Sequence, residues 1–156
     1  MQSSTIDEVT DAVLTASRVL VAVAARSLAG VASDVTLVQY RALVVLCSRG
    51  PQTMARLAEA LECSPSTATR LCDRLVARGL VERAPRAGNR RVIEVSSTAK
   101  ANGLVREVTV RRRRDIAKIV RQVNPTQRGP MVDALRAFAE AAGETPEQAW
   151  SLGWTS

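Results

Sequence analysis

A rapid succession of helix caps and turn residues across residues 53–97 constrains the fold more than any other feature of the chain. Thr53 is a candidate N-cap for a short helix whose inward face carries Leu57. Ser64 can cap a second helix with Pro65 at its first position, where the missing N–H costs nothing. The pattern therefore predicts two short helices in direct succession.

The second of these helices is amphipathic, and its polar face has an uncommon composition. At about 100° per residue, one side collects Ala68, Leu71, Cys72, Leu75 and Val76. The other side collects Ser66, Arg70, Asp73, Arg74 and Ala77. A helix exposed only to water more typically shows Glu and Lys, whereas Ser, Thr and Arg suit phosphates and base edges. An ordinary solvated face remains the alternative.

A basic hairpin follows the second helix. Gly79 ends the helix, and the segments "LVER" and "RRVIEVSS" are typical of two strands. Between them "APRAGNR" supplies the Pro, Gly and Asn of a turn, with Arg86, Arg90 and Arg91 on it. Two helices followed by a basic two-stranded hairpin predict a winged helix-turn-helix, in which the second helix enters the major groove of DNA and the wing reaches the flanking minor groove.

The distribution of charge agrees with a nucleic-acid partner. Residues 64–114 carry 13 Lys and Arg against 4 Asp and Glu, an excess of +9, whereas residues 1–63 and 115–156 each have an excess of −1. A block of one sign within a neutral chain favours a polyanion, because neutralised phosphates release counterions. A basic surface that only keeps the protein soluble is the alternative interpretation.

Longer helices flank this region, so we expect a mainly α protein with a small β-hairpin. An apolar stripe predicts a helix from Ile6 to about Leu28, formed by Val9, Val13, Ala16, Leu20 and Val23. A second helix is expected between Thr36 and Gly50, and a long one from Thr98 to about Val123. The last helix starts at Asn124–Pro125 or at Pro130, and its stripe is Val132, Leu135, Phe138 and Ala142.

Composition argues against several other classes of protein. The chain has no histidine, and Cys47, Cys63 and Cys72 form no CxxC pair, so we expect no metal site, no cofactor and no enzymatic activity. Three cysteines suit buried thiols in a reducing compartment. No unbroken apolar run approaches about 18 residues, and the acidic start differs from a signal peptide. We therefore expect a cytoplasmic protein without membrane association.

The order of these elements resembles the MarR (multiple antibiotic resistance regulator) family of transcriptional regulators over nearly the whole chain. The resemblance is carried by "LVQYRALVVL", then "MARLAEALECSPSTATRLCDRLVARGLVERA", then "NRRVIEVSSTAKA" and a long helix. It implies an obligate homodimer that binds a pseudo-palindromic operator, and we expect the protein to act as a repressor. Residues 1–35 would be an N-terminal dimerisation helix, 36–97 the DNA-binding domain, and 98–156 C-terminal dimerisation helices.

The resemblance also assigns residues to DNA. Ser64 to Arg78 would be the recognition helix, and Arg91 the wing residue in the minor groove. Asn89 stands where the family usually has an aspartate, so it could hydrogen-bond the Arg91 guanidinium but supplies no charge. The residues expected to contact DNA are Ser64, Ser66, Thr67, Thr69, Arg70, Arg74, Arg86, Asn89, Arg90 and Arg91.

Regulation is less constrained by the residues themselves. In relatives a small aromatic or anionic effector can bind between the winged domain and the dimerisation helices, and we would place it near Arg18, Tyr40, Arg41 and Leu46. One alternative is a cysteine-based redox-sensing regulator that depends on Cys63. Another is a winged-helix module used only for protein contacts.

Two further features have an open role. Arg111 to Arg114 spread around one helix, where they serve solvation and ion pairing between subunits, or else bind phosphates or an anionic ligand. Trp150 and Trp154 are the only tryptophans, and we expect them to pack across the dimer.

Overall fold

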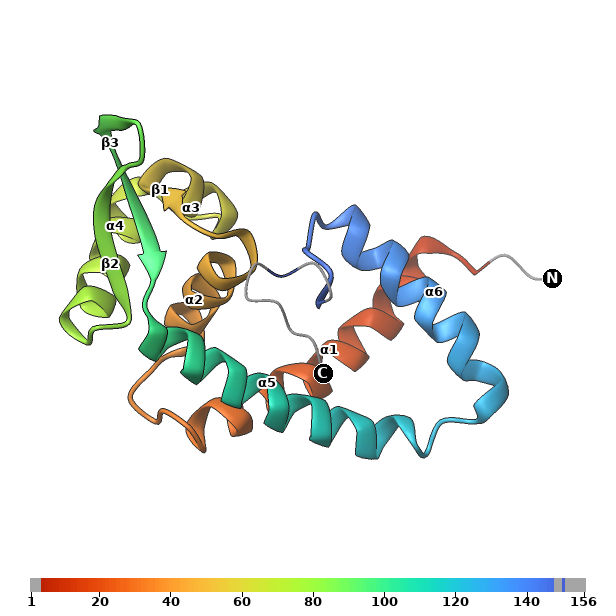
Figure 1. Cartoon of the computed structure of the whole chain (residues 1–156). Helices are drawn as coiled ribbons and strands as arrows, with labels where there is room; N and C mark the ends of the chain where they lie inside the picture. Colours follow the sequence, from red (N-terminus) through yellow and green to blue (C-terminus); the bar gives the residue numbers. More distant parts are fainter. Residues whose placement is uncertain (1–3, 148–149, 151–156) are drawn as a thin grey trace.

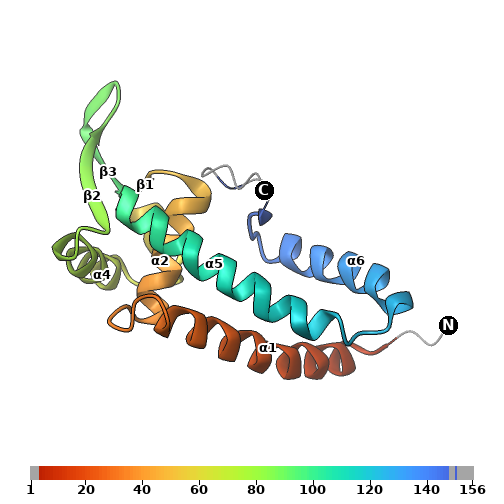
Figure 2. The same ribbon diagram turned by 60° about the horizontal axis from the view of Figure 1, so that its bottom comes forward.

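The computed structural model describes residues 4–147 and 150. Residues 36–97 form a head at one end of the molecule, and long helices extend from it (Figures 1 and 2). The elements in chain order are α1 (Ile6–Ala29), α2 (Leu37–Arg49), β1 (Gln52–Thr53), α3 (Met54–Ala60), α4 (Pro65–Ala77), β2 (Val81–Arg86), β3 (Asn89–Ser97), α5 (Ala99–Val120) and α6 (Pro125–Ala141). The predicted mainly α winged helix-turn-helix is confirmed.

Local side-chain caps fix where the helices begin. Thr36, Thr53, Ser64 and Thr98 each accept a hydrogen bond from a backbone N–H in the first turn, as the sequence predicted. Thr98 does more, because its hydroxyl also donates to the carbonyl of Gly79 at 2.7 Å. The uncertain start of α6 is decided by the Asn124 cap, which leaves Pro130 inside the helix.

The sheet has three strands in the order β1-β3-β2, all antiparallel. The predicted hairpin of β2 and β3 pairs Val81 with Ser97 and turns at Gly88, whose φ of 81° favours glycine. The third strand was missed, because β1 has only two residues and its partner Val95 lies far along the chain. Along β3 the side chain of Val95 is buried, whereas that of Ile93 is 49% exposed.

The hydrophobic core lies in the head and at the root of α5. The largest fully buried side chains of the head are Leu43, Leu46, Leu57, Leu75, Val45 and Val95, together with Cys47 and Cys72. Val105 and Val108 extend this core along α5. On α4 the expected inward face is wrong at Val76, which is exposed because it lies at the outer edge of the helix.

Helices α1 and α6 bury little of their apolar stripes. α1 lies along α5 (Figure 2), yet only Val23 of its expected stripe is buried. No described residue of α6 is buried, and Leu135 and Phe138 are more than half exposed. Both helices therefore present apolar surface that this single chain does not cover.

Helix α1 is long and apolar. Its best 18-residue window has a mean hydropathy of 1.5, so by length and composition the helix could cross a bilayer. Arg18 and Arg26 interrupt its apolar run, in agreement with the expectation that no unbroken run approaches the length of a membrane span. Numerous Ala and Val residues raise the average nonetheless.

The segment after α6 returns to the head of the same chain. Arg49 donates to the carbonyl of Gly143 at 3.2 Å, and Arg41 pairs with Glu144 at 2.8 Å. Trp150 is buried against the core, with its indole N–H donating to the carbonyl of Thr145 at 3.2 Å. The expectation that Trp150 packs across a dimer is therefore wrong for this structure, and Trp154 lies outside the described residues.

Candidate nucleic-acid interface

Helix α4 combines a buried face with a polar face that points away from the head. Ala68, Cys72 and Leu75 are fully buried and fix the rotation of the helix. This rotation leaves Arg70 and Arg74 exposed one turn apart. The remaining polar residues of the helix predicted to meet DNA are also exposed: Ser64, Ser66, Thr67 and Thr69.

Hydroxyl groups cluster at the N-terminus of α4. Ser64 Oγ accepts the N–H of Thr67 at 3.2 Å and lies 2.9 Å from Thr67 Oγ1 and 3.0 Å from Ser66 Oγ. The Thr69 hydroxyl donates to the carbonyl of Pro65 at 2.9 Å. Exposed hydroxyls and unpaired N–H groups at a helix N-terminus are suited to phosphate oxygens.

The arginines of α4 are available for an anionic partner. Neither Arg70 nor Arg74 forms an ion pair with any described residue, although Arg70 Nε lies 3.5 Å from the carbonyl of Ser66. The carboxylate beside them, Asp73, pairs instead with Arg83 of β2 at 2.7 Å. This pair neutralises Asp73 and joins the helix to the wing.

The arginines of the wing differ in whether their charge is neutralised by an ion pair. Arg86 pairs with Glu94 at 2.8 Å, so part of its charge is neutralised. Arg90 and Arg91 are exposed and form no ion pair within the described part of the chain. The expected contact of Asn89 with the Arg91 guanidinium is replaced by another, because Asn89 Oδ1 accepts the backbone N–H of Arg91 at 3.2 Å. Asn89 therefore shapes the turn.

The four residues proposed to contact an effector are not brought into one cavity. Leu46 is fully buried in the core, and Arg18 is exposed on α1, where it hydrogen-bonds Thr15 at 3.3 Å. Tyr40 is buried, which raises the pKa of its hydroxyl, while the charge of Arg112 opposes that shift. Arg41 pairs with Glu144. Arg41 also lines a cavity of about 580 Å³ with Arg49 and Arg56, and Tyr40 lies beside Arg112.

Arg112 borders a cavity of about 370 Å³ on α5. The cavity is lined by Thr109, Arg112, Arg113, Ile116, Ala117, Val120 and Glu147. The Nε atom of Arg112 is buried without a hydrogen-bond partner among the described residues. The sequence analysis offered Arg112 and Arg113 as possible anion-binding residues, but it could not locate the cavity, because α5 and the segment after α6 meet only in the fold.

The arginine run spreads around α5 as expected, and its ion pairs lie within the chain. Arg111 pairs with Glu107 at 3.2 Å, and Arg114 approaches Asp115 at 3.3 Å. Hydrogen bonds from Lys118 and Arg114 lower the pKa of the Asp115 carboxyl. Arg111 also packs against Gly30 at the end of α1, where a Cβ would lie 2.6 Å from its Nη1.

The cysteines differ in their accessibility. Cys47 and Cys72 are fully buried, and burial raises the pKa of both thiols. Cys63 is partly exposed and borders a largely apolar cavity of about 280 Å³ with Thr67 and Leu71. Among the residues with described positions, no group of three His, Cys, Asp or Glu side chains could hold a metal ion.

Comparison with known proteins identifies the family to which the chain belongs. Residues 33–92 match the sequence profile of the MarR family. No curated protein matches the chain. The crystal structure of RV1404 from Mycobacterium tuberculosis is 43% identical, with a TM-score of 0.84 over 94% of this chain and 99% of that one.

Two more distant structures share the fold. Bordetella bronchiseptica BpsR, whose DNA binding is regulated by 6-hydroxynicotinic acid, is 22% identical with a TM-score of 0.63 over 88% of this chain and 98% of that one. Streptococcus pneumoniae FabT, solved in complex with DNA, is 16% identical with a TM-score of 0.73 over 89% of this chain and 98% of that one. With its DNA-binding winged helix, the chain belongs to the MarR family of transcriptional regulators.

Proposed function

We propose that the protein is a repressor that binds a pseudo-palindromic operator as a homodimer. The observation that carries this proposal is the position of α4 and the wing, which the Asp73–Arg83 pair joins into one cationic surface. In this arrangement α4 reads one half-site in the major groove through Ser66, Thr67, Arg70 and Arg74. Ser64, Thr69, Arg86, Asn89, Arg90 and Arg91 contact the backbone and the flanking minor groove.

A second copy of the chain completes the DNA-binding unit. The exposed apolar residues of α1 and α6 form the dimer contacts, so residues 1–35 and 98–156 act as dimerisation regions and 36–97 as the DNA-binding domain. Two recognition helices are then set about 34 Å apart, one turn of DNA. A soluble, cytoplasmic dimer explains the apolar face of α1 without a membrane.

An effector regulates the repressor in this proposal. BpsR responds to a small aromatic acid, and the Tyr40 and Arg112 pair offers an aromatic ring beside an unpartnered guanidinium nitrogen. The protein has no catalytic role and needs no cofactor, in keeping with a family of transcription factors.

A cysteine-based response is the second candidate, and one observation favours it. Cys63 directly precedes the cap of the recognition helix and is partly exposed beside a cavity. Oxidation or alkylation there would place added atoms against α4. Operator affinity that is unchanged after complete alkylation of Cys63 would eliminate this candidate.

Selection of duplexes from a random DNA library by the purified protein tests the main proposal. We expect an enriched inverted repeat with half-site centres about one helical turn apart, and sedimentation as a dimer at micromolar concentration. Enrichment of a single unrepeated site, or a monomer that binds DNA with full affinity, would contradict the proposal.

A further inference from the structure

Helix α6 is fixed to the rest of the chain mainly near its two ends. No described residue of α6 is buried, so the body of the helix makes no core contact within this chain. Helix α5 leads from the head to one end of α6, and the segment after α6 leads from the other end back to the head (Figure 1). The head, α5 and α6 therefore form a closed loop, and contacts at its three corners decide where α6 lies.

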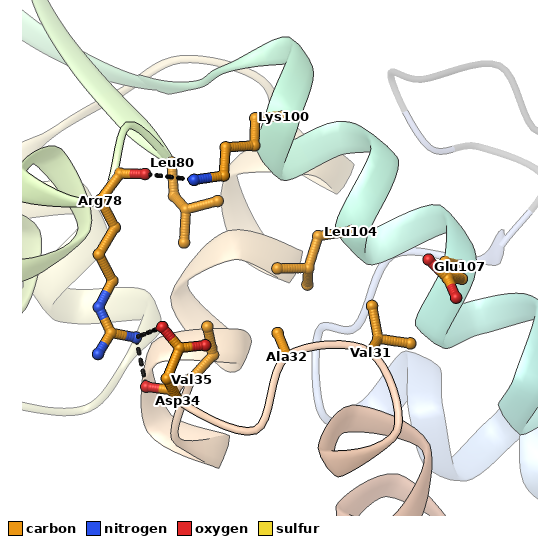
Figure 3. A pocket seen from close by; sticks show the side chains of 9 residues that line it. All are labelled: Val31, Ala32, Asp34, Val35, Arg78, Leu80, Lys100, Leu104 and Glu107. Carbon is orange, nitrogen blue, oxygen red and sulfur yellow. Dashed lines mark hydrogen bonds and ion pairs between the residues drawn. The ribbon is translucent and has the colours of Figure 1, made fainter.

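The first corner is the start of α5. Lys100 donates from Nζ to the carbonyl of Arg78, which follows α4 directly, at 2.9 Å. The guanidinium of Arg78 in turn pairs with the carboxylate of Asp34, in the loop before α2, at 3.3 Å (Figure 3). These contacts connect α5 to the end of the recognition helix, so they constrain the direction in which α5 leaves the head.

The second corner is the turn between α5 and α6. Arg128 of α6 donates from Nε to the carbonyl of Val123 and from Nη2 to the carbonyl of Arg121, each at 3.1 Å. Both carbonyls lie in the turn that follows α5, where the helix offers them no backbone donor. One side chain thereby holds the two helices at a set angle.

The third corner is the segment after α6, residues 142–150, here called the return segment. Gly143 has a φ of 68°, and this left-handed conformation turns the chain away from the axis of α6. The carbonyl of Gly143 accepts from Arg49 at 3.2 Å, and Glu144 pairs with Arg41 at 2.8 Å. Two arginines of α2 therefore hold the beginning of the return segment against the head.

Trp150 supplies most of the attachment of the return segment. It is 8% exposed and belongs to the core cluster of the head, and its indole N–H donates to the carbonyl of Thr145. A buried tryptophan removes a large apolar area from water. The Arg41–Glu144 pair is partly exposed and contributes less to stability. Its role is to fix which part of the segment lies against α2.

We propose that the return segment sets the separation of the two recognition helices in the dimer, and hence the operator spacing that the protein accepts. The inference rests on the proposed function, in which the exposed apolar face of α6 contacts a second copy of the chain. Because the return segment ties α6 to the head, each head has a defined position relative to the partner. Detachment of the segment leaves α6 held at the α5–α6 turn alone, and the heads then move relative to each other.

Tryptophan fluorescence without DNA tests the attachment. Trp150 and Trp154 are the only tryptophans, so Trp154→Phe leaves Trp150 as the single emitter. We expect the emission of a buried indole. In this background Arg41→Glu and Glu144→Arg should each shift the emission to longer wavelength, because like charges then face each other. The protein with both charge substitutions restores the pair and should restore the emission.

Arg56→Glu is the matched control for these charge substitutions. Arg56 borders the same cavity as Arg41, but it forms no ion pair with any described residue and does not contact the return segment. Its substitution should leave the emission unchanged. Emission of an exposed indole in the Trp154→Phe protein, or equal emission in the single and double charge variants, would overturn the attachment.

The spacing is tested with three duplexes: the selected operator, the same operator with one base pair inserted between its half-sites, and a single half-site. The insertion rotates the second half-site by about 35° and moves it by about 3.4 Å. Wild-type protein should prefer the selected operator to the lengthened one about 10-fold or more, since a stiff connection favours one geometry. Trp150→Ala should reduce this preference to about 3-fold or less and leave the half-site affinity unchanged, because a flexible connection spreads the second head over many positions.

The charge variants repeat the comparison without a cavity in the core. Arg41→Glu should lose part of the spacing preference, and the protein with both Arg41→Glu and Glu144→Arg should regain it. A thermal melt and sedimentation show that each variant is folded and dimeric. A spacing preference that Trp150→Ala and Arg41→Glu both leave unchanged, or equal losses on all three duplexes, would overturn the proposal. If the wild type selects no inverted repeat, the proposed function fails, and the fluorescence still decides whether the return segment is attached.

Discussion

The head and the outer helices differ in how much of their apolar surface the chain itself buries. In the head, Leu43, Leu57 and Leu75 are completely buried by residues of the same chain. In α6, Leu135 and Phe138 are 51% and 56% exposed, and α1 keeps Val9 and Leu20 exposed as well. The core of the head is therefore closed within one chain, whereas the outer helices leave apolar surface for another molecule to cover.

The largest expected effect concerns the buried core of the head. Leu75→Ala removes a fully buried side chain of α4 and should lower the free energy of unfolding by about 2–5 kcal/mol. Val76→Ala is the neighbouring control on the exposed side and should cost within about 0.5 kcal/mol. Urea denaturation at one fixed protein concentration measures both. Similar losses in the two variants would mean that the head is not closed as described.

A charge introduced on α6 tests whether the exposed apolar face of this helix is covered by a second copy of the chain. Phe138→Glu should weaken self-association by about 2–4 kcal/mol, because a carboxylate would be buried at the interface. Sedimentation over a range of concentrations measures the change. Arg136→Glu places the same residue on another side of the helix and should leave the dimer intact. A Phe138→Glu protein that sediments like the wild type would show that α6 is covered in some other way.

Substitutions on the DNA surface refine the account of the head. Arg70→Ala should cost about 1–3 kcal/mol in operator binding and relax the choice of base. Arg90→Ala should weaken operator and random DNA alike, because a wing arginine that meets phosphate carries no sequence information. Fluorescence anisotropy with both duplexes measures these losses. Equal losses on the two duplexes for Arg70→Ala would refute its role in reading bases.

The smallest effect concerns pH at the junction of the two regions. Burial raises the pKa of Tyr40, so the unfolded chain loses that proton first as the pH rises and stability falls through the alkaline range. Tyr40→Phe should flatten this fall between about pH 8 and 10.5, on either side of the ordinary tyrosine pKa. Urea denaturation at the two pH values measures the slope. The buried thiols of Cys47 and Cys72 contribute the same sign and remain in the variant.

The sequence could predict what depends on neighbouring residues. The caps Thr36, Thr53, Ser64 and Thr98 act within one helical turn, so their spacing alone located the helices. The turn at Gly88 was equally local. The order of these elements was enough to indicate both the winged fold and the face of α4 that carries Arg70.

Contacts between distant segments could not be predicted. The Asp34–Arg78 pair joins residues 44 positions apart, and Arg49 meets Gly143 across 94 positions. The burial of Trp150 depends on the same return of the chain. The partner of Asn89 could not be predicted either. Its amide oxygen can accept from a backbone N–H of its own turn or from a guanidinium, and the backbone geometry of the turn selects the N–H of Arg91.

The double role of Thr98 has a consequence for movement. Its hydroxyl accepts the N–H of Ala101 in the first turn of α5 and donates to the carbonyl of Gly79 just beyond α4. One side chain thus joins the long helix to the base of the hairpin, and a rotation of α5 carries both reading elements with it. In the proposed dimer, adjustment to operators of different spacing would then take place further along α5 or in the loop before α2.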